Sequence, residues 1–337
     1  MLHSLNPEAE HVFAVVQLKA LGDILLTTPV VRALKVAFPR SKVIFICNKI
    51  GRLMLDGNPH IDQFMFFDRT DALGDYLKKV RLLRSEKIDV LFDFMNNPRS
   101  AFISFFSGAK RKVSYPSARS FLYTDVMQVK SSDCYIVEQK LSLIEAVGIS
   151  ESGRELDFYF SSADESVFHH FREKIGNSDD LVVILSATHK RERRKWPVQN
   201  YAKLADYLTE TYAAVVVWSW GPGEEQFVDG AIAKCKSKSY KMPPTTMREM
   251  AAFYRNSDLF VGNSNGPSHV AVAVGLSSIQ LHGHTDGRSW CPDNGLHRFI
   301  QSSEFGRVDA TLESITLEDV KKITDEMLSE IVSLKKK

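Results

Sequence analysis

The hydrophobic pattern of the first 160 residues alternates between two kinds of segment. Four short segments are nearly continuous in Val, Ile, Leu and Phe, as strands covered on both faces of a sheet are, and they lie at 12–18, 42–48, 63–67 and 88–94. Between them, segments 29–38 and 71–84 repeat apolar residues at helical spacing. Strands that alternate with helices predict a mainly parallel sheet with right-handed crossovers.

The same pattern restarts after a polar stretch at 161–180, which we expect to be a linker in which 167–175 can form a helix. Further strands are predicted at 181–187, 214–220, 258–262 and 278–281, the last being the final strand. Further helices are predicted at 197–211, 245–256, 266–274 and 317–334. We therefore expect two Rossmann-like domains, at 1–165 and 178–310, followed by a C-terminal helix within 311–337 that ends in Lys335, Lys336 and Lys337.

Composition and charge narrow the class of protein. At 337 residues the chain is long enough for two domains, and its 44% hydrophobic and 25% charged residues are ordinary for a soluble protein. A net charge of +2 argues against a polyanion as the general partner. Four widely spaced cysteines form no CxxC pair, and no window of 18 apolar residues occurs. We therefore expect a cytoplasmic protein without a zinc site, a disulfide or a membrane span.

Two glycine turns, at 19–29 and 262–269, each follow a predicted strand and lead into a helix. Such turns lie at the edge where open α/β sheets bind ligands, and a helix N-terminus suits an anion. In the first turn Asp23 is either a helix cap or a general base, and position alone favours the cap. The small residues of the second turn suit a diphosphate, although an ordinary turn explains them too, and His269 is as readily structural as ligand-binding.

Two further loops carry charge at the ends of predicted strands. Five of the seven residues at 189–195 are Lys or Arg, and Lys195 is best placed to contact a diphosphate, although such runs are usually solvated. Nucleic-acid binding is a weaker interpretation, since no second basic stripe with aromatic residues is present. After the strand at 214–220, Glu224 and Glu225 either bind a ribose or favour a helix start. Gln226 stands where a dinucleotide fingerprint needs its third glycine, which disfavours a nicotinamide oxidoreductase.

An apolar run with Phe102, Phe105 and Phe106 is followed by a basic run at 110–112. A helix that faces the core and the start of a strand are the favoured interpretation of the phenylalanines. The cations suit either an acidic acceptor or anionic lipid head groups.

Taken together, these motifs resemble glycosyltransferase family nine, the ADP-heptose:lipopolysaccharide heptosyltransferases. The resemblance runs through nearly the whole chain, and its markers are the segments 21–29, 99–100 with 107–112, 195–197, 221–225, 262–269 and 283–286. It implies a GT-B fold, with two Rossmann-like domains facing across a cleft, the donor bound by the C-terminal half and the acceptor by the N-terminal half. It also implies an inverting reaction without a metal ion or other cofactor. No Asp-x-Asp motif occurs in the chain.

The resemblance also implies roles for particular residues. Asp23 becomes the base that activates the acceptor hydroxyl, and Lys195 meets the charge of the departing ADP. The residues implied to bind the donor are Thr188, Lys195, Glu224, Glu225, Ser264, Asn265, Gly266, Pro267, His269 and Thr285. Those implied to bind the acceptor are Asp23, Asn96, Arg99, Lys110 and Arg111. The implied partners are ADP-heptose or another nucleotide sugar, a lipid-anchored oligosaccharide and the cytoplasmic face of the inner membrane, and no nucleic acid.

One motif departs from the family. Its members usually read Asn-Asp-Ser/Thr-Gly in the phosphate turn, whereas this chain has Asn263, Ser264, Asn265 and Gly266. The change leaves two alternatives open, a transferase that uses a different sugar nucleotide and a catalytically silent sugar-nucleotide binder.

Overall fold

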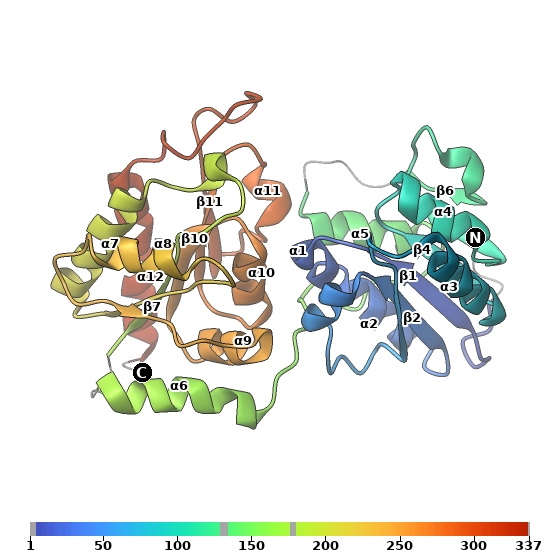
Figure 1. The fold of residues 1–337 in the computed structure, drawn as a ribbon, viewed down its shortest axis with the longest axis horizontal. Helices are drawn as coiled ribbons and strands as arrows, with labels where there is room; N and C mark the ends of the chain where they lie inside the picture. The colour runs from blue at the N-terminus through green and yellow to red at the C-terminus, as the bar shows by residue number, and fades with distance from the viewer. Residues whose placement is uncertain (1–4, 129–133, 176–179, 336–337) are drawn as a thin grey trace. The chain divides into compact units, whose positions relative to one another are not determined.

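The computed structural model describes residues 5–128, 134–175 and 180–335, and the chain divides into two compact units, Met1–Tyr159 and Phe160–Lys337. Each unit is a parallel sheet with its own helices (Figure 1). Lys336 and Lys337, and the part of the predicted linker at 176–179, lie outside the described residues.

The first unit contains a six-stranded sheet in the order β3-β2-β1-β4-β5-β6. Its strands are β1 (Val12–Val16), β2 (Lys42–Cys47), β3 (Gln63–Phe66), β4 (Val90–Asp93), β5 (Arg111–Ser114) and β6 (Asp125–Val126), all of them parallel. Its α-helices are α1 (Leu21–Leu25), α2 (Thr28–Ala37), α3 (Leu73–Ser85), α4 (Pro98–Phe106) and α5 (Ile136–Glu145). The four predicted strands and the helices at 29–38 and 71–84 are confirmed, whereas α1, α5 and β6 were not predicted.

The second unit repeats this plan, with a sheet in the order β12-β11-β10-β7-β8-β9. Its strands are β7 (Val182–Ser186), β8 (Val215–Trp218), β9 (Tyr240–Lys241), β10 (Leu259–Asn263), β11 (Ser278–His282) and β12 (His297–Gln301). Its α-helices are α6 (Ser162–Ile175), α7 (Val198–Tyr212), α8 (Glu225–Ile232), α9 (Met247–Arg255), α10 (Gly266–Ala273), α11 (Gly287–Trp290) and α12 (Leu317–Lys335). The prediction of β11 as the last strand is wrong, because β12 pairs with it at the edge of the sheet.

Most of the predicted linker is a helix. The side chains of Phe168 and Phe171 are buried, and both rings pack against Phe253 of α9. Burial of two aromatic rings is a strong stabilising term, so α6 is an integral layer of the second unit. The helix that was expected within 167–175 is therefore present, but it begins earlier, at Ser162, and the polar stretch around it is not a linker.

The strand order places a topological switch point in each sheet. In the first, the chain runs from β1 outwards to β2 and β3 and then returns to β4 on the other side of β1. In the second, β7 and β10 are the neighbouring strands at which the direction reverses. Open α/β sheets bind ligands outside the carboxyl ends of the strands at such points. A ligand site is therefore expected in the loops that follow β1, β4, β7 and β10.

Among the described residues, no helix is both long enough and apolar enough to cross a bilayer.

Candidate active site

Asp23 lies at the first switch point, in the short helix α1 that follows β1. Its Oδ2 accepts a hydrogen bond from the backbone N–H of Ala20 at 3.1 Å, so Asp23 caps α1 from the third position of the helix, while Ala20 rather than Asp23 is the N-cap. Among the described residues, no hydrogen bond reaches its second carboxylate oxygen, and the side chain is half-buried. A carboxylate held by one oxygen leaves the other available to accept a proton, so the cap does not exclude the predicted role as a base.

Two predicted acceptor residues follow β4, across the same switch point. Asn96 is buried and braces its own loop, because its Nδ2 donates to the carbonyl of Tyr115 at 2.6 Å and its Oδ1 accepts from Ser117 at 3.0 Å. Its φ of 45° is a conformation that asparagine tolerates better than most residues. Arg99 lies in the first turn of α4, half-buried, and donates to the carbonyl of Phe67 at 3.3 Å. Arg99 therefore lies at the same edge of the sheet as Asp23, while Asn96 shapes the loop, and the predicted contact of Arg99 with the acceptor stays a prediction.

The other two predicted acceptor residues lie at the opposite edge of the sheet. Lys110 immediately precedes β5 and pairs with Asp89, which precedes β4, at 2.7 Å. Arg111 begins β5 and forms an ion pair with Asp125. The amino ends of parallel strands lie a full strand length from their carboxyl ends, so neither cation belongs to the switch point of Asp23. The prediction that Lys110 and Arg111 bind the acceptor beside Asp23 is therefore corrected. The basic run was assigned from its motif alone, and the motif does not show which end of the strand it occupies.

The phenylalanines of α4 were expected to face the core, and this expectation is wrong. Phe102, Phe105 and Phe106 are 38%, 47% and 38% exposed, and their rings contact one another in a row. The helix buries a different face, formed by Ser100, Ala101, Ile103 and Ser104. The prediction used the size and apolarity of the phenylalanines as a guide to burial, whereas Ile103 and three small residues of the helix fill its buried face.

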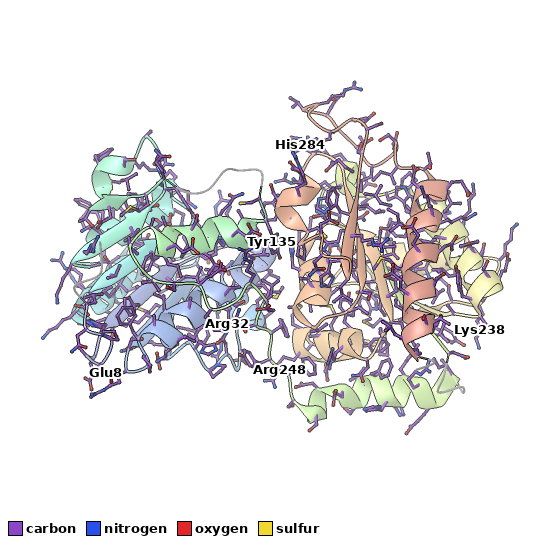
Figure 2. All side chains as sticks on the ribbon, turned by 180° about the vertical axis from the view of Figure 1, so that it is seen from behind. Glu8, Arg32, Tyr135, Lys238, Arg248 and His284 are labelled. Atoms are coloured by element: carbon purple, nitrogen blue, oxygen red, sulfur yellow. The ribbon has the colours of Figure 1, made fainter. Side chains whose placement is uncertain are left out.

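Lys140 of α5 is a buried residue near Asp23 that the sequence analysis missed. Its side chain is 3% exposed, and its Nζ donates to Gln17 Oε1 at 2.8 Å and to Thr27 Oγ1 at 3.0 Å. Burial lowers its pKa to about 8, an effect that the negative charge of Asp23 partly offsets. Figure 2 labels Tyr135 at the start of α5, the helix that carries this lysine.

In the second unit, the basic loop after β7 places Lys195 beside an acid and a ring. Its Nζ lies 2.7 Å from Glu192 Oε2 and 4.6 Å from the centre of the Phe227 ring, and the side chain is 21% exposed. Glu192 is itself largely exposed, so solvent screens this ion pair and an incoming anion can compete for the lysine. The predicted contact between Lys195 and a diphosphate stays a prediction.

Arg194 is a better candidate than Lys195 for binding an anion in this loop, and it was not among the predicted site residues. Burial lowers its pKa, and the neighbouring positive charges of Arg191 and Arg193 lower it further. Its Nε is buried without a hydrogen-bond partner in the described part of the chain, which also offers it no ion pair. A half-buried guanidinium with an unused donor, beside like charges, is suited to an anionic ligand.

The turn after β10 is built around Asn265, which caps α10. Its Oδ1 accepts from the N–H of Ser268 at 3.1 Å, and its Nδ2 donates to the carbonyl of Thr188 at 3.1 Å. The side-chain amide is thus occupied by the protein, whereas the resemblance implied that Asn265 binds the donor. Pro267 has no N–H, so the amide of Gly266 is the one left at the tip of the turn in the described structure.

Asn263 connects this turn with the basic loop. Its Oδ1 accepts from the N–H of Trp196 at 3.0 Å and from the hydroxyl of Tyr201 at 3.1 Å, and its Nδ2 donates to the carbonyl of Ala187 at 2.9 Å. Trp196 is fully buried, and its indole donates to the carbonyl of Ile315 at 2.8 Å. The carboxyl ends of β7 and β10 are therefore fixed to each other by a fully buried amide.

The two glutamates after β8 behave differently. Glu224 accepts from the N–H of Gly221 at 2.9 Å and stays half-buried at the edge of the sheet. Glu225 points to Lys241, with which it pairs at 2.9 Å. Of the two predicted ribose ligands, Glu224 is the one that the turn holds at the carboxyl edge.

Three residues surround the end of β11. His269 and Thr285 were predicted to bind the donor, and His282 is their neighbour. His269 is buried, with its ring centre 6.1 Å from that of Trp290. His282 is fully buried, and burial together with the charge of His269 lowers its pKa to about 3, so it stays neutral at physiological pH. Thr285 lies 3.3 Å from His282 Nδ1 and is half-buried at the same edge. Only Thr285 of these has a side chain open to a ligand.

No group of three or more His, Cys, Asp or Glu side chains that could hold a metal ion occurs among residues 5–128, 134–175 and 180–335.

Comparison with known proteins assigns this arrangement to a family. Residues 76–308, more than half of the chain, match the sequence model of glycosyltransferase family 9 (heptosyltransferase). The chain belongs to glycosyltransferase family 9. It is accordingly a glycosyltransferase, as the motifs predicted.

Relatives in family 9 match along nearly their whole length. Lipopolysaccharide heptosyltransferase 3 of Escherichia coli (strain K12) is 24% identical over 333 residues, covering 92% of this chain and 96% of that protein. A family 9 structure from Veillonella parvula gives a TM-score of 0.82 at 18% identity, covering 96% and 100% of the two chains. The E. coli heptosyltransferase WaaC with ADP gives 0.74 at 15% identity, covering 94% and 99%. These likenesses confirm the predicted GT-B fold.

The departure from the family's phosphate turn can now be separated into two parts. Asn265 stands where family 9 usually has Ser or Thr, and it caps α10 as a hydroxyl would, so that exchange preserves the local structure. Ser264 stands where the family has Asp, and its side chain is half-exposed at the edge of the sheet. Against the motif that the resemblance implies, the chemical difference is therefore a serine in place of one carboxylate at position 264.

Proposed function

We propose that this protein transfers a heptose from ADP-heptose to a lipopolysaccharide inner-core acceptor, with inversion at the anomeric carbon and without a metal ion. The observation that carries the proposal is the contrast between the two switch points. Within the part of the chain that the structure describes, one holds a half-buried carboxylate with an unused oxygen, and the other holds a half-buried guanidinium without an ion pair and a helix N-terminus. Glycosyl transfer by direct displacement needs one of each, a base for the nucleophile and positive charge for the leaving group. The names of the relatives support heptose as the sugar and lipopolysaccharide as the acceptor.

In the proposed reaction, Asp23 takes the proton of the acceptor hydroxyl as its oxygen attacks the anomeric carbon. The bond from that carbon to the diphosphate oxygen breaks, and ADP leaves with the bonding electrons. Attack from the side opposite the leaving group inverts the configuration. Arg194, Lys195 and the amide of Gly266 stabilise the charge that develops on the diphosphate, while Glu224 binds the ribose. These cations would do the work that a metal ion does in other transferases.

The test is a turnover assay with the purified full chain, ADP-heptose and a heptose-accepting core oligosaccharide, with release of ADP as the readout. We expect ADP release that depends on the acceptor, persists in EDTA and yields a product of inverted anomeric configuration by NMR. A product that retains the donor configuration, or activity abolished by EDTA and restored by a divalent ion, would contradict the mechanism.

Ser264 motivates the second candidate, a family 9 enzyme that uses another sugar nucleotide. A thermal-shift screen against ADP- and UDP-sugars separates the two, because the true donor should raise the Tm most. A third candidate, a silent binder, would show donor binding without product for any acceptor tested.

For a lipid-anchored acceptor, we further propose that the enzyme works at an anionic membrane surface through its α3–α4 surface, defined as Leu73, Leu77, Phe102, Phe105 and Phe106. Helices α3 and α4 lie side by side (Figure 1), and the ring of Tyr76 contacts that of Phe102. All five members are between 38% and 74% exposed. Residues 71–112 contain nine Lys or Arg against five Asp or Glu, although the whole chain carries only +2. Exposed aromatic residues with surplus positive charge suit the interface of an anionic bilayer.

Vesicle co-sedimentation tests this part of the proposal. Wild-type protein should bind vesicles that contain phosphatidylglycerol more tightly than vesicles of phosphatidylcholine alone. The double variant Phe105→Ser/Phe106→Ser should bind the anionic vesicles about tenfold more weakly. Val308→Ser, which removes an exposed apolar side chain of the second unit, is the matched control and should bind like the parent. Equal binding by all three proteins would reject this surface.

A further inference from the structure

The buried amine of Lys140 lies at the centre of a hydrogen-bond network that reaches both sides of Asp23. On one side it donates to Gln17 Oε1 at 2.8 Å, and the Nε2 of Gln17 donates to the carbonyl of Lys19 at 2.6 Å. On the other side it donates to Thr27 Oγ1 at 3.0 Å, and that hydroxyl donates to the carbonyl of Asp23 itself at 2.7 Å. Each neutral partner thus accepts from the lysine and passes a hydrogen bond on to the turn.

No carboxylate pairs with Lys140 among the described residues. The contacts of its amine are the uncharged side chains of Gln17 and Thr27, and the amine also lies 5.2 Å from the centre of the Phe94 ring. Asp23 is the charged group whose field acts on it. A buried cation without a paired acid is unfavourable to folding, so a role in function is a reason for keeping one at this position.

We propose that Lys140 is a positioning residue for Asp23, holding the turn at residues 19–27 from within the core and keeping a positive charge behind the carboxylate. This inference rests on the proposed role of Asp23 as the base. The two hydrogen-bonded arms fix the backbone at Lys19, which precedes α1, and at Asp23 itself within α1, and therefore the direction of the free carboxylate oxygen. The charge favours the ionised carboxylate, which is the form that accepts a proton.

Two variants separate the charge from the geometry. Lys140→Met keeps the length and the apolar stem of the side chain but removes the charge and all donors. Thr27→Val keeps the shape and the charge of the lysine but cuts the arm that reaches the carbonyl of Asp23. Lys35→Met is the matched control, because Lys35 is a largely buried lysine of α2 in the same unit whose amine contacts Ser41 and Asp62 rather than the turn.

We expect Lys140→Met to lower kcat at least tenfold, and Thr27→Val severalfold, while the affinity for ADP measured by calorimetry stays within twofold of the parent. In Lys140→Met the acid limb of the kcat/KM profile should move to higher pH, because the ionised carboxylate has lost its stabilising charge. Lys140→Arg, which keeps a cation, should retain the limb of the parent. Lys35→Met should lose thermal stability but not kcat.

The outcomes distinguish this inference from the proposed function. If Asp23→Asn turns over like the parent, the base assignment itself is wrong. If Asp23→Asn is inactive but Thr27→Val and Lys140→Met keep the parental kcat and pH profile, Lys140 is only structural and this inference is overturned. If Lys140→Met does not fold, Thr27→Val decides alone, since unchanged kcat in that variant contradicts the positioning role.

Discussion

The two units share one strand plan but surround their switch points with opposite chemistry. Beside β1 and β4, the structure presents a carboxylate supported from within by buried polar residues, with the lysine of α5 hidden from solvent. Beside β7 and β10, it presents cations and backbone amides at the edge, with the buried asparagine Asn263 beneath them. The topology determines where a ligand can bind, and the local residues decide which charge it must carry.

The two units also differ in where their charged side chains lie. The first unit keeps its cation inside and exposes its acid, whereas the second leaves several cations near the surface with one exposed glutamate among them. A base must stay ionised and reachable, while an anion site must attract and then release its ligand. If the two switch points act independently, a change at one should leave ligand binding at the other unaltered.

The largest effect is expected for Asp23→Asn. Removal of a general base should lower kcat by a factor of about 10² to 10⁴, because the acceptor hydroxyl keeps its proton as it attacks. The affinity for ADP should not change if the second unit binds the donor. Asp75→Asn, at an exposed carboxylate of α3, is the control for a simple loss of charge in the same unit. Steady-state kinetics and calorimetry measure the two quantities, and weaker ADP binding in Asp23→Asn would break the division of roles between the units.

The next effect is on stability and concerns Lys140. Its pKa in the folded protein is about 8, against an ordinary value of 10.5, because burial disfavours the charged form. Below pH 8 the lysine is charged in both the folded and the unfolded protein, so folding carries the full free-energy cost of burying the charge. Between pH 8 and 10.5 the folded protein releases the proton while the unfolded chain still holds it, so stability rises with pH.

The free energy of unfolding of the parent, relative to that of Lys140→Met, should therefore rise by up to about 3 kcal/mol between pH 7 and pH 10.5. Urea titrations of both proteins at several pH values measure this difference, in which the contributions of other groups cancel. A flat difference would mean that the lysine is not buried in solution.

A smaller effect is expected at the cationic edge. Arg194→Gln should weaken ADP binding by about 10- to 100-fold, since it removes a half-buried charge that forms no ion pair with the described acidic residues. Lys195→Gln should cost less, because Glu192 already engages that lysine. Lys190→Gln, at an exposed position of the same loop, is the control. The reverse order of the two losses would show that Lys195 is the principal diphosphate ligand after all.

The smallest effect is expected for the cap of α10. Asn265→Ala should lower the free energy of unfolding by about 1 kcal/mol, and Asn265→Ser should restore most of it, because a hydroxyl can accept the same bond from Ser268. Thermal or urea unfolding measures both. A large loss of ADP affinity in Asn265→Ser, with the stability intact, would mean that the amide contacts the donor directly.

The sequence predicted the alternation of strands and helices well, because buried parallel strands and amphipathic helices have distinct periods. It did not predict β6 and β9, which are two residues long, or β12, which ends a loop-rich segment. The helix α6 was mostly taken for a linker because only Phe168 and Phe171 of its side chains are buried.

The candidate site was predicted in part, and the failures have physical causes. Turns at strand ends located Asp23, Glu224 and Gly266, since glycine turns and helix starts leave a local signal. Lys110 and Arg111 were misplaced, because a motif does not reveal which end of a strand it occupies.

Lys140 was missed although a signal was present. It continues the helical stripe formed by Val137, Leu141 and Ile144, where a lysine is unexpected. Arg194 had no such signal, since burial within a loop of five cations depends on the tertiary fold.

The buried amide of Asn263 has a consequence for how the enzyme meets its donor. Because this side chain joins the end of β10 to the backbone at Trp196 and Ala187, the start and end of the basic loop are immobilised when the unit folds. The conformational entropy of those residues is lost once, during folding, and not again at each encounter with a nucleotide sugar. Each catalytic cycle then begins with the two ends of the loop already fixed.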